Sequence, residues 1–308
     1  MKQAIEQQFQ ALQDQICLAL QTIDGKGKFV QDIWQREGGG GGRSRVMCNG
    51  EVIEKGGVNF SAVFGEPPEK MLVALQLEQA DFFATGVSIV LHPQSPMVPI
   101  IHMNVRYFEM SNGVWWFGGG IDLTPHYVVP EQAAWFHWQL KKVCDQHDSS
   151  YYQTFKQWAD DYFYIKHRQE TRGVGGIFFD HLNTQKTGKT QPQLFDFVLS
   201  VGRAFVPIYA HLVELNRHIP FGEREKKWQQ LRRGRYVEFN LVWDKGTKFG
   251  LDTDGRTESI LMSMPPQAHW EYNFTPPAES PEAATLTWLK RGIDWINLLP
   301  LRSAVEQT

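Results

Sequence analysis

The sequence predicts an α+β fold in which a mainly antiparallel β-sheet is covered by helices. Strand-like segments follow one another around 45–50, 51–64, 84–92, 100–110 and 114–121. The helical segments are grouped instead of alternating with strands, which is typical of antiparallel sheets. The chain of 308 residues contains neither an internal repeat nor a long linker, so we expect a single domain over 1–308.

Hydrophobic periodicity predicts the helices. Apolar residues recur every three or four positions from Ile5 to Leu20, which indicates an amphipathic first helix. Further helices are expected at 130–148, 151–168, 192–217 and 223–232. The last helix is expected to begin at Pro281 after an N-cap at Ser280, to bury a stripe from Leu286 to Ile296, and to end at Pro300.

Four further strands complete the prediction, and they are expected at 174–179, 235–243, 248–251 and 257–264. Five consecutive glycines at 38–42 resemble a phosphate cradle, but neither of the two common glycine motifs for phosphate is present. A flexible loop is therefore the favoured interpretation there, and the neighbouring Arg43 and Arg45 remain candidates for binding an anion.

Composition limits the classes of function. The net charge is −3 and the basic runs are short, so nucleic acid is not an expected partner. Three cysteines without CxxC spacing favour a reducing compartment. The first residues open no secretory signal, and the uncharged stretch 87–105 carries prolines and histidines that argue against a transmembrane segment, so we expect a cytoplasmic protein.

The two strands at 86–92 and 100–107 carry the strongest functional signal. Side chains alternate between the faces of a strand, so His102, Asn104 and Arg106 share one face. Ser88 and His92 share a face of the preceding strand, and the opposite faces of both strands are apolar. An imidazole, an amide, a hydroxyl and a fixed positive charge on one surface indicate a functional site, with a half-exposed sheet as the alternative.

Two aspartates stand at positions typical of a site. Asp122 follows an aromatic strand and three glycines, where it either faces a ligand or caps a turn. Asp244 follows an apolar segment and precedes a Lys-Gly turn, and an ordinary strand-end turn is its alternative. The histidines have no compact metal-ligand spacing, so a structural role is favoured for His137 and His167.

Taken together, the sequence resembles the oxygen-dependent coproporphyrinogen III oxidases from about Trp34 to Tyr272. Eight segments match in the right order, with these bounds: 37–40, 54–61, 98–109, 115–125, 161–168, 172–180, 233–241 and 258–263. The resemblance implies a homodimer in which each subunit has a large, flat antiparallel sheet between layers of helices. It also implies oxidative decarboxylation of two propionates of coproporphyrinogen III to vinyl groups, which gives protoporphyrinogen IX. Dioxygen is then the co-substrate, no organic cofactor is expected, and a divalent metal attributed to the family is expected to be dispensable.

The resemblance also assigns roles to residues of this chain. It implies that His102 is a proton donor, that Asp122 and Arg172 are functional, and that Asp244 accepts hydrogen bonds from the pyrrole N–H groups. Arg106 and Arg172 correspond to cationic clamps for the propionates. The expected substrate-binding residues are Ser88, Asn104, Val105, Arg106, Lys245, Asp254, Gly255 and Arg256, and the expected metal ligands are His92, His102, His137 and His167.

Three departures from the family pattern leave alternatives open. Lys245 and Trp138 stand where arginine is common, and Asp254 stands where glycine is usual. Lysine keeps the charge but loses the planar fork of arginine. The first alternative is therefore a paralogue that binds a tetrapyrrole without converting it. The second is a metal-dependent hydrolase that uses the four histidines.

Overall fold

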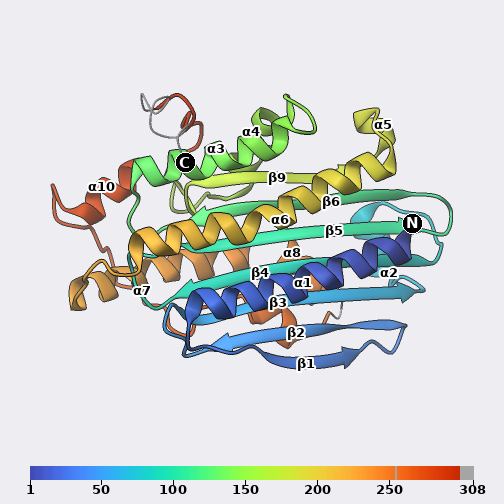
Figure 1. The fold of residues 1–308 in the computed structure, drawn as a ribbon, viewed down its shortest axis with the longest axis horizontal. Helices are drawn as coiled ribbons and strands as arrows, with labels where there is room; N and C mark the ends of the chain where they lie inside the picture. Colours follow the sequence, from blue (N-terminus) through green and yellow to red (C-terminus); the bar gives the residue numbers. More distant parts are fainter. Residues whose placement is uncertain (254, 299–308) are drawn as a thin grey trace.

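A seven-stranded antiparallel sheet forms the centre of the molecule in a computed structural model, which describes residues 1–253 and 255–298. The strand order is β1-β2-β3-β4-β5-β6-β9, so the chain runs as a meander until β9 joins at the far edge (Figure 1). The strands are β1 (Val30–Gln35), β2 (Gly40–Cys48), β3 (Ile53–Gly65), β4 (Phe82–Pro93), β5 (Ile100–Met110), β6 (Trp115–Thr124) and β9 (Gly175–Leu182). The predicted α+β class with a large antiparallel sheet is confirmed.

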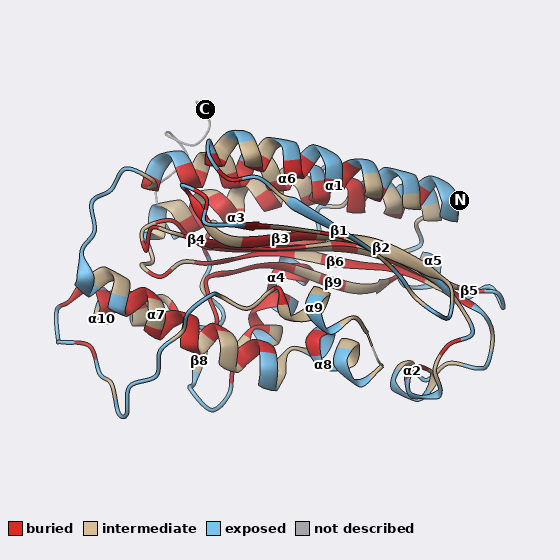
Figure 2. Cartoon of the chain, turned by 90° about the horizontal axis from the view of Figure 1, so that it is seen from below, coloured by how far each residue is buried: buried red, intermediate tan, exposed pale blue. Residues whose placement is uncertain are grey.

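Helices cover both faces of this sheet, as Figure 2 shows. One face carries α1 (Lys2–Asp24), α3 (Pro130–Asp145) and α6 (Gln191–Asn216). The other carries α7 (Glu223–Glu238), α8 (Lys245–Asp252) and α9 (Thr257–Leu261). The remaining elements are α2 (Glu69–Leu75), α4 (Tyr151–Tyr162), β7 (Tyr164–Ile165), β8 (Glu170–Thr171), α5 (Thr184–Thr187), the π-helix η1 (Phe239–Trp243) and α10 (Pro281–Trp288).

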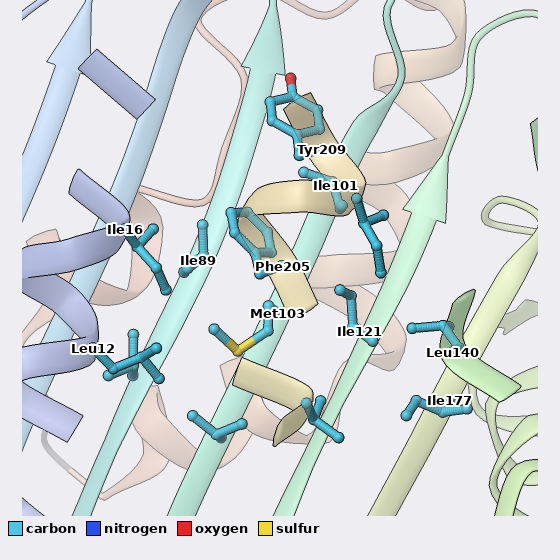
Figure 3. Packing of buried hydrophobic residues seen from close by; sticks show 14 of the residues in the cluster. Leu12, Ile16, Ile89, Ile101, Met103, Ile121, Leu140, Ile177, Phe205 and Tyr209 are labelled. Atoms are coloured by element: carbon cyan, nitrogen blue, oxygen red, sulfur yellow. The ribbon is translucent and has the colours of Figure 1, made fainter. Parts of the chain in front are cut away.

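The apolar core lies between the sheet and α1, α3 and α6. Ile89, Ile101 and Met103 point from β4 and β5 toward Phe205 and Tyr209 of α6 (Figure 3). Each is at most 1% exposed, so burial of these side chains contributes roughly 1.5–3 kcal/mol each. The core uses one face of the sheet, which leaves the polar face of β4 and β5 free to build a site.

Helix α6 belongs to this core. By length and composition alone it is the one described helix that could cross a membrane, with mean hydropathy 1.3 over its best window. Its buried residues, which include Phe197, Val201 and Phe205, are packed in the hydrophobic core.

Two of the predicted boundaries are wrong near the N-terminal edge of the sheet. Residues 30–35 form a strand that the sequence analysis did not predict, and Gly40 to Gly42 belong to β2 instead of a loop. Trp34 of β1 pairs with Gly42, and a Cβ on Gly42 would lie 2.5 Å from the Trp34 ring. Glycine is therefore needed in this strand because an indole occupies the space of its side chain.

The larger error concerns the three strands predicted at 235–243, 248–251 and 257–264, where the structure has helices. Helix α7 continues to Glu238 and passes into η1, and α8 and α9 follow. The buried positions Arg232, Arg233, Tyr236, Phe239 and Asn240 recur with helical spacing. Because several of these buried residues are polar, the apolar alternation around 237–243 indicated a strand instead.

The helices predicted at 151–168 and from Pro281 are shorter in the structure. Helix α4 ends at Tyr162 and α10 at Trp288. Leu289 and Trp295 are buried, but Gly292 has φ +78°, which interrupts a continuous helix. Pro300, the predicted end of the last helix, lies outside the described residues.

Candidate active site

The polar face of the central strands brings the predicted residues into register. Ser88 lies opposite Asn104, and His102 lies opposite both Val90 and Asp122. Arg106 lies between Gly86 and Gly118 on the neighbouring strands. The two glycines beside Arg106 have no side chain that projects from this face of the sheet. The alternation in the sequence correctly placed His102, Asn104 and Arg106 on one face.

His102, Asp122 and Arg172 form a buried cluster at the end of this face. The side chain of Arg172 donates from Nη2 to Oδ2 of Asp122 at 2.5 Å, and Nδ1 of His102 lies 3.2 Å from the same oxygen. Their side chains are at most 10% exposed. A buried carboxylate is thus paired with a fixed cation on one side and an imidazole on the other.

The surroundings set the charge state of this cluster. Burial by itself raises the pKa of Asp122, but the charge of Arg172 and the contact with His102 outweigh it and hold that pKa below its ordinary value. Burial and the neighbouring Arg172 lower the pKa of His102, although Asp122 opposes the shift. The cluster at neutral pH therefore contains a carboxylate, a guanidinium and a neutral imidazole.

The ring nitrogens of His102 are buried and unpaired within the part of the chain that the structure describes. Among the described residues neither of its ring nitrogens has a hydrogen-bond partner of good geometry, although both are buried. Tyr236 of α7 stacks on the imidazole with a centroid separation of 5.2 Å. A neutral imidazole fixed by stacking, with a carboxylate beside Nδ1, can accept or donate a proton at Nε2.

Arg172 is held inside a box of aromatic side chains. Its guanidinium lies over the rings of Phe163, Phe239 and Tyr236 at 4.3, 4.8 and 5.4 Å from their centroids. Its Nη1 donates to Oδ1 of Asn240 at 3.0 Å. The sequence analysis expected Arg172 as a propionate clamp; in the structure its side chain is 4% exposed and paired with Asp122.

Asp244 lies at the junction between η1 and α8. It caps α8, because Oδ2 accepts hydrogen bonds from the backbone N–H and the hydroxyl of Thr247, each at 2.7 Å. Its other oxygen, Oδ1, accepts from the hydroxyl of Tyr162 at 2.7 Å. Asp244 thus caps a helix and does not lie in the strand-end turn considered as its alternative, and its carboxylate is fixed by contacts with α4 and α8.

The expected substrate-binding residues fall into three groups. Ser88, Asn104 and Arg106 lie on the polar face, whereas the side chain of Val105 is fully buried in the core on the opposite face. Val105 can thus offer only its backbone, because successive side chains in a strand alternate. The others, Lys245, Gly255 and Arg256, lie in or beside α8 and α9, and Asp254 lies outside the described residues.

Residues 256–264 are held against the N-terminal half of the sheet by contacts with side chains of β1 and β3. Asn59 donates to the carbonyl of Ser259 at 2.7 Å, and Lys55 donates to that of Met264 at 2.8 Å. Arg256 pairs with Asp32 of β1. Arg256 is therefore placed beside the sheet by contacts that are distant in sequence.

The four histidines expected to bind a metal do not form a site. His92 is fully buried with Nε2 2.7 Å from the Ser263 carbonyl, and His137 lies between the hydroxyl of Tyr152 and the carbonyl of Val174. His167 is partly exposed and lies 2.7 Å from Glu238. Among residues 1–253 and 255–298, no group of three or more metal-ligating side chains is placed to hold an ion, so the histidine set does not fit a metal.

Four residues of the site were not singled out from the sequence. Tyr162, Asp180, Tyr236 and Asn240 each contact one of the expected functional residues. Tyr236 and Asn240 are four residues apart and hydrogen bonded to each other, so a helical interpretation of 235–243 would have placed them together.

Comparison with known proteins shows the family of the chain. The family model described as coproporphyrinogen III oxidase matches residues 4–295. The chain belongs to this family. An oxygen-dependent coproporphyrinogen-III oxidase from Synechococcus sp. (strain CC9605) is 48% identical over 92% of this chain and 85% of that protein. Another with the same description, from Prochlorococcus marinus (strain MIT 9313), is 48% identical over 92% of this chain and 88% of that protein.

The match to the coproporphyrinogen III oxidase family extends over the whole polar face. The family match includes every expected site residue from Ser88 to Arg256. It also includes the buried His102 cluster, the capping carboxylate Asp244 and the half-exposed Arg106. The resemblance stated from the sequence motifs is thereby confirmed.

Proposed function

We propose that this protein catalyses the oxygen-dependent oxidative decarboxylation of two propionates of coproporphyrinogen III, giving protoporphyrinogen IX. Each propionate loses its carboxyl carbon as carbon dioxide and one hydrogen from the carbon next to the ring. The two electrons released reduce dioxygen to hydrogen peroxide. The observation that carries the proposal is the polar sheet face with His102, Asp122 and Arg106 in a member of this family.

Arg106 is the residue best placed to hold a propionate. Its side chain is 35% exposed and lies on the same face as His102, four residues further along β5. Guanidinium groups pair with carboxylates through two parallel hydrogen bonds. Arg256, at the start of α9, is the second candidate, and Lys245 supplies an ammonium group beside Asp244.

Asp244 is suited to accept hydrogen bonds from the pyrrole N–H groups. Oδ2 of Asp244 accepts two hydrogen bonds from Thr247 and Oδ1 accepts one from Tyr162, which leaves a lone pair on Oδ1 available and fixes the orientation of the carboxylate. Hydrogen bonding from a pyrrole N–H raises the electron density of the ring. Such a ring gives up electrons to dioxygen more readily.

We assign the proton transfer to His102. Its buried neutral imidazole lies next to Asp122, so the imidazolium formed on taking a proton is stabilised by the carboxylate. The expectation from the sequence was a proton donor, and the same contact lets the protonated ring return the proton. Arg172 keeps Asp122 ionised throughout.

Further parts of the proposal concern the state of the protein. We propose one domain over 1–308, a cytoplasmic location and a homodimer. The exposed Val30 and Ile33 of edge strand β1 support association, because unpaired apolar edges favour contact with another chain. A resident metal has no part in this proposal, because the histidines do not converge.

The test is turnover of coproporphyrinogen III in air, followed by chromatographic separation of the porphyrins. We expect loss of the tetracarboxylate and appearance of the dicarboxylate divinyl product. Binding without any product would instead identify a non-catalytic tetrapyrrole-binding paralogue. Asp244→Asn should lower kcat at least a hundredfold, and unchanged turnover would refute the role of Asp244.

A further inference from the structure

We propose that Asp180 is a positioning residue that fixes the guanidinium of Arg106 in the orientation needed to bind a carboxylate of the substrate. The proposal rests on the function proposed above and adds a residue to which the sequence assigned no role. Three observations around Arg106 support it. The guanidinium is held from two sides, β9 has a β-bulge at Asp180, and the neighbouring position 118 is a glycine.

The contact holds Arg106 from both sides. Nη1 of Arg106 donates to Oδ1 of Asn104 at 2.8 Å, and Nη2 lies 3.0 Å from Oδ1 of Asp180. Long flexible side chains such as arginine lose much rotamer freedom when they are fixed. A guanidinium that is already held before the substrate arrives loses less on binding.

The bulge lies in β9 at Asp180. The pairing of β6 with β9 steps from Phe117 opposite Leu182 to Gly119 opposite Phe179, so Gly118 alone faces two residues. His181, one of these two residues, has φ +54°, an uncommon conformation for a residue with a side chain. Phe179 and Leu182 both remain in the core, while Asp180 and His181 lie outside it. Bulges re-aim side chains next to active sites.

Contacts around His181 keep Asp180 in place. The backbone N–H of His181 donates to Oδ1 of Asp180 at 2.9 Å, and its ring stacks on Trp116 with centroids 4.6 Å apart. Burial would raise the pKa of Asp180, but the hydrogen bonds from His181 and the charge of Arg106 hold it at about 2. The group is therefore a fixed carboxylate at any working pH.

Gly118 provides the space for the pair. A Cβ on Gly118 would lie 2.6 Å from Oδ1 of Asp180 and 2.7 Å from Nε of Arg106. These distances are well inside van der Waals contact, so any side chain at this position displaces the pair. The pair therefore lies directly on the sheet, in the space that a side chain at 118 would occupy.

Asp180 supplies orientation and not attraction. A carboxylate beside Arg106 weakens the electrostatic attraction of the clamp for another carboxylate. Removing Asp180 thus has two opposing effects, and the sign of the change in KM reports which one dominates. Positioning predicts a higher KM, whereas simple charge neutralisation predicts a lower one.

The experiment measures KM and kcat for Asp180→Ala and Gly118→Ala, with Glu214→Gln at an exposed position of α6 as the control for loss of one carboxylate. We expect KM to rise roughly tenfold in Asp180→Ala while kcat stays within about twofold of the wild-type value. The lost interaction contributes equally to binding of the substrate and of the transition state, so it changes KM and not kcat. Gly118→Ala keeps both charges and displaces the pair, so it should raise KM similarly. Glu214→Gln should leave both constants unchanged.

A double variant separates positioning from general damage. In an Arg106→Gln background, Asp180→Ala should raise KM by less than about twofold, because the residue it positions is absent. An unchanged or lower KM in Asp180→Ala, or an additive effect in the double variant, would overturn the proposal. Titration with coproporphyrin III, a tetracarboxylate that is not turned over, measures binding without catalysis. Suppose that the wild type binds coproporphyrin III, that Asp180→Ala binds it more weakly, and that neither protein forms product from coproporphyrinogen III in air. The proposed function then fails and the positioning role stands.

Discussion

Replacement of Arg172 with glutamine removes the cation that compensates the buried carboxylate of Asp122. The guanidinium of Arg172 donates to Asp122 at 2.5 Å and to Asn240 at 3.0 Å, and both charged side chains are at most 8% exposed. Breaking a buried pair leaves one charge without a partner, which costs about 3–5 kcal/mol. We therefore expect the free energy of unfolding at pH 7 to fall by that amount.

Arg291→Gln is the matched control for this variant. Arg291 pairs with Asp161 at 3.2 Å, but the two side chains are 49% and 55% exposed, so the pair contributes at most about 1 kcal/mol. Urea unfolding followed by circular dichroism gives both values, provided that the slope with denaturant is unchanged. A loss in Arg172→Gln no larger than in Arg291→Gln would refute the reasoning. The double variant Asp122→Asn/Arg172→Gln should recover part of the loss, because neither charge then remains unpaired.

Two further predictions concern stability. The pKa of His137 is lowered by burial to about 3, below the value of about 6.5 expected in the unfolded chain, so protonation favours unfolding. The stability that this residue contributes is complete above about pH 6.5 and falls by about 1.4 kcal/mol per pH unit as the pH drops toward 3. When urea unfolding is measured at pH 7 and 5, His137→Gln should weaken the dependence of the unfolding free energy on pH by the equivalent of about one proton taken up on unfolding. An equal dependence in the variant and the wild type would contradict the assignment. Asp24 accepts hydrogen bonds from the backbone N–H groups of Val52 and Ile53 at 2.9 and 2.8 Å and joins the end of α1 to the turn before β3. Asp24→Ala leaves these donors buried without a partner and should lower the unfolding free energy by at least about 3 kcal/mol, as measured by urea denaturation; a loss below about 1 kcal/mol would show that the turn does not depend on it.

Much of the sheet could be predicted because its signal is local. Apolar and polar residues alternate along β4 and β5, and this alternation alone places His102, Asn104 and Arg106 on one face and Ile101, Met103 and Val105 in the core. The same pattern placed Val105 away from the substrate, although the family resemblance had included it in the binding set.

The helical elements α7, η1, α8 and α9 could not be predicted in this way. Its buried face carries Arg233, Tyr236 and Asn240, and a hydrophobicity pattern does not count such residues as buried. They are buried because they pair with Glu54, Ser263 and Arg172 from other elements. Tertiary contacts therefore overrode the local apolar alternation.

The sequence by itself determined the fold class, the family and the polar face of the central strands, because strand periodicity and ordered motifs are properties of neighbouring residues. Only the tertiary structure decided that Arg172 pairs with Asp122, that Tyr162 donates to Asp244, that Asp180 pairs with Arg106, and that the four histidines form no metal-binding group. Such pairings join residues tens of positions apart. Their geometry depends on how strands register and helices pack, and neither is written in local spacing.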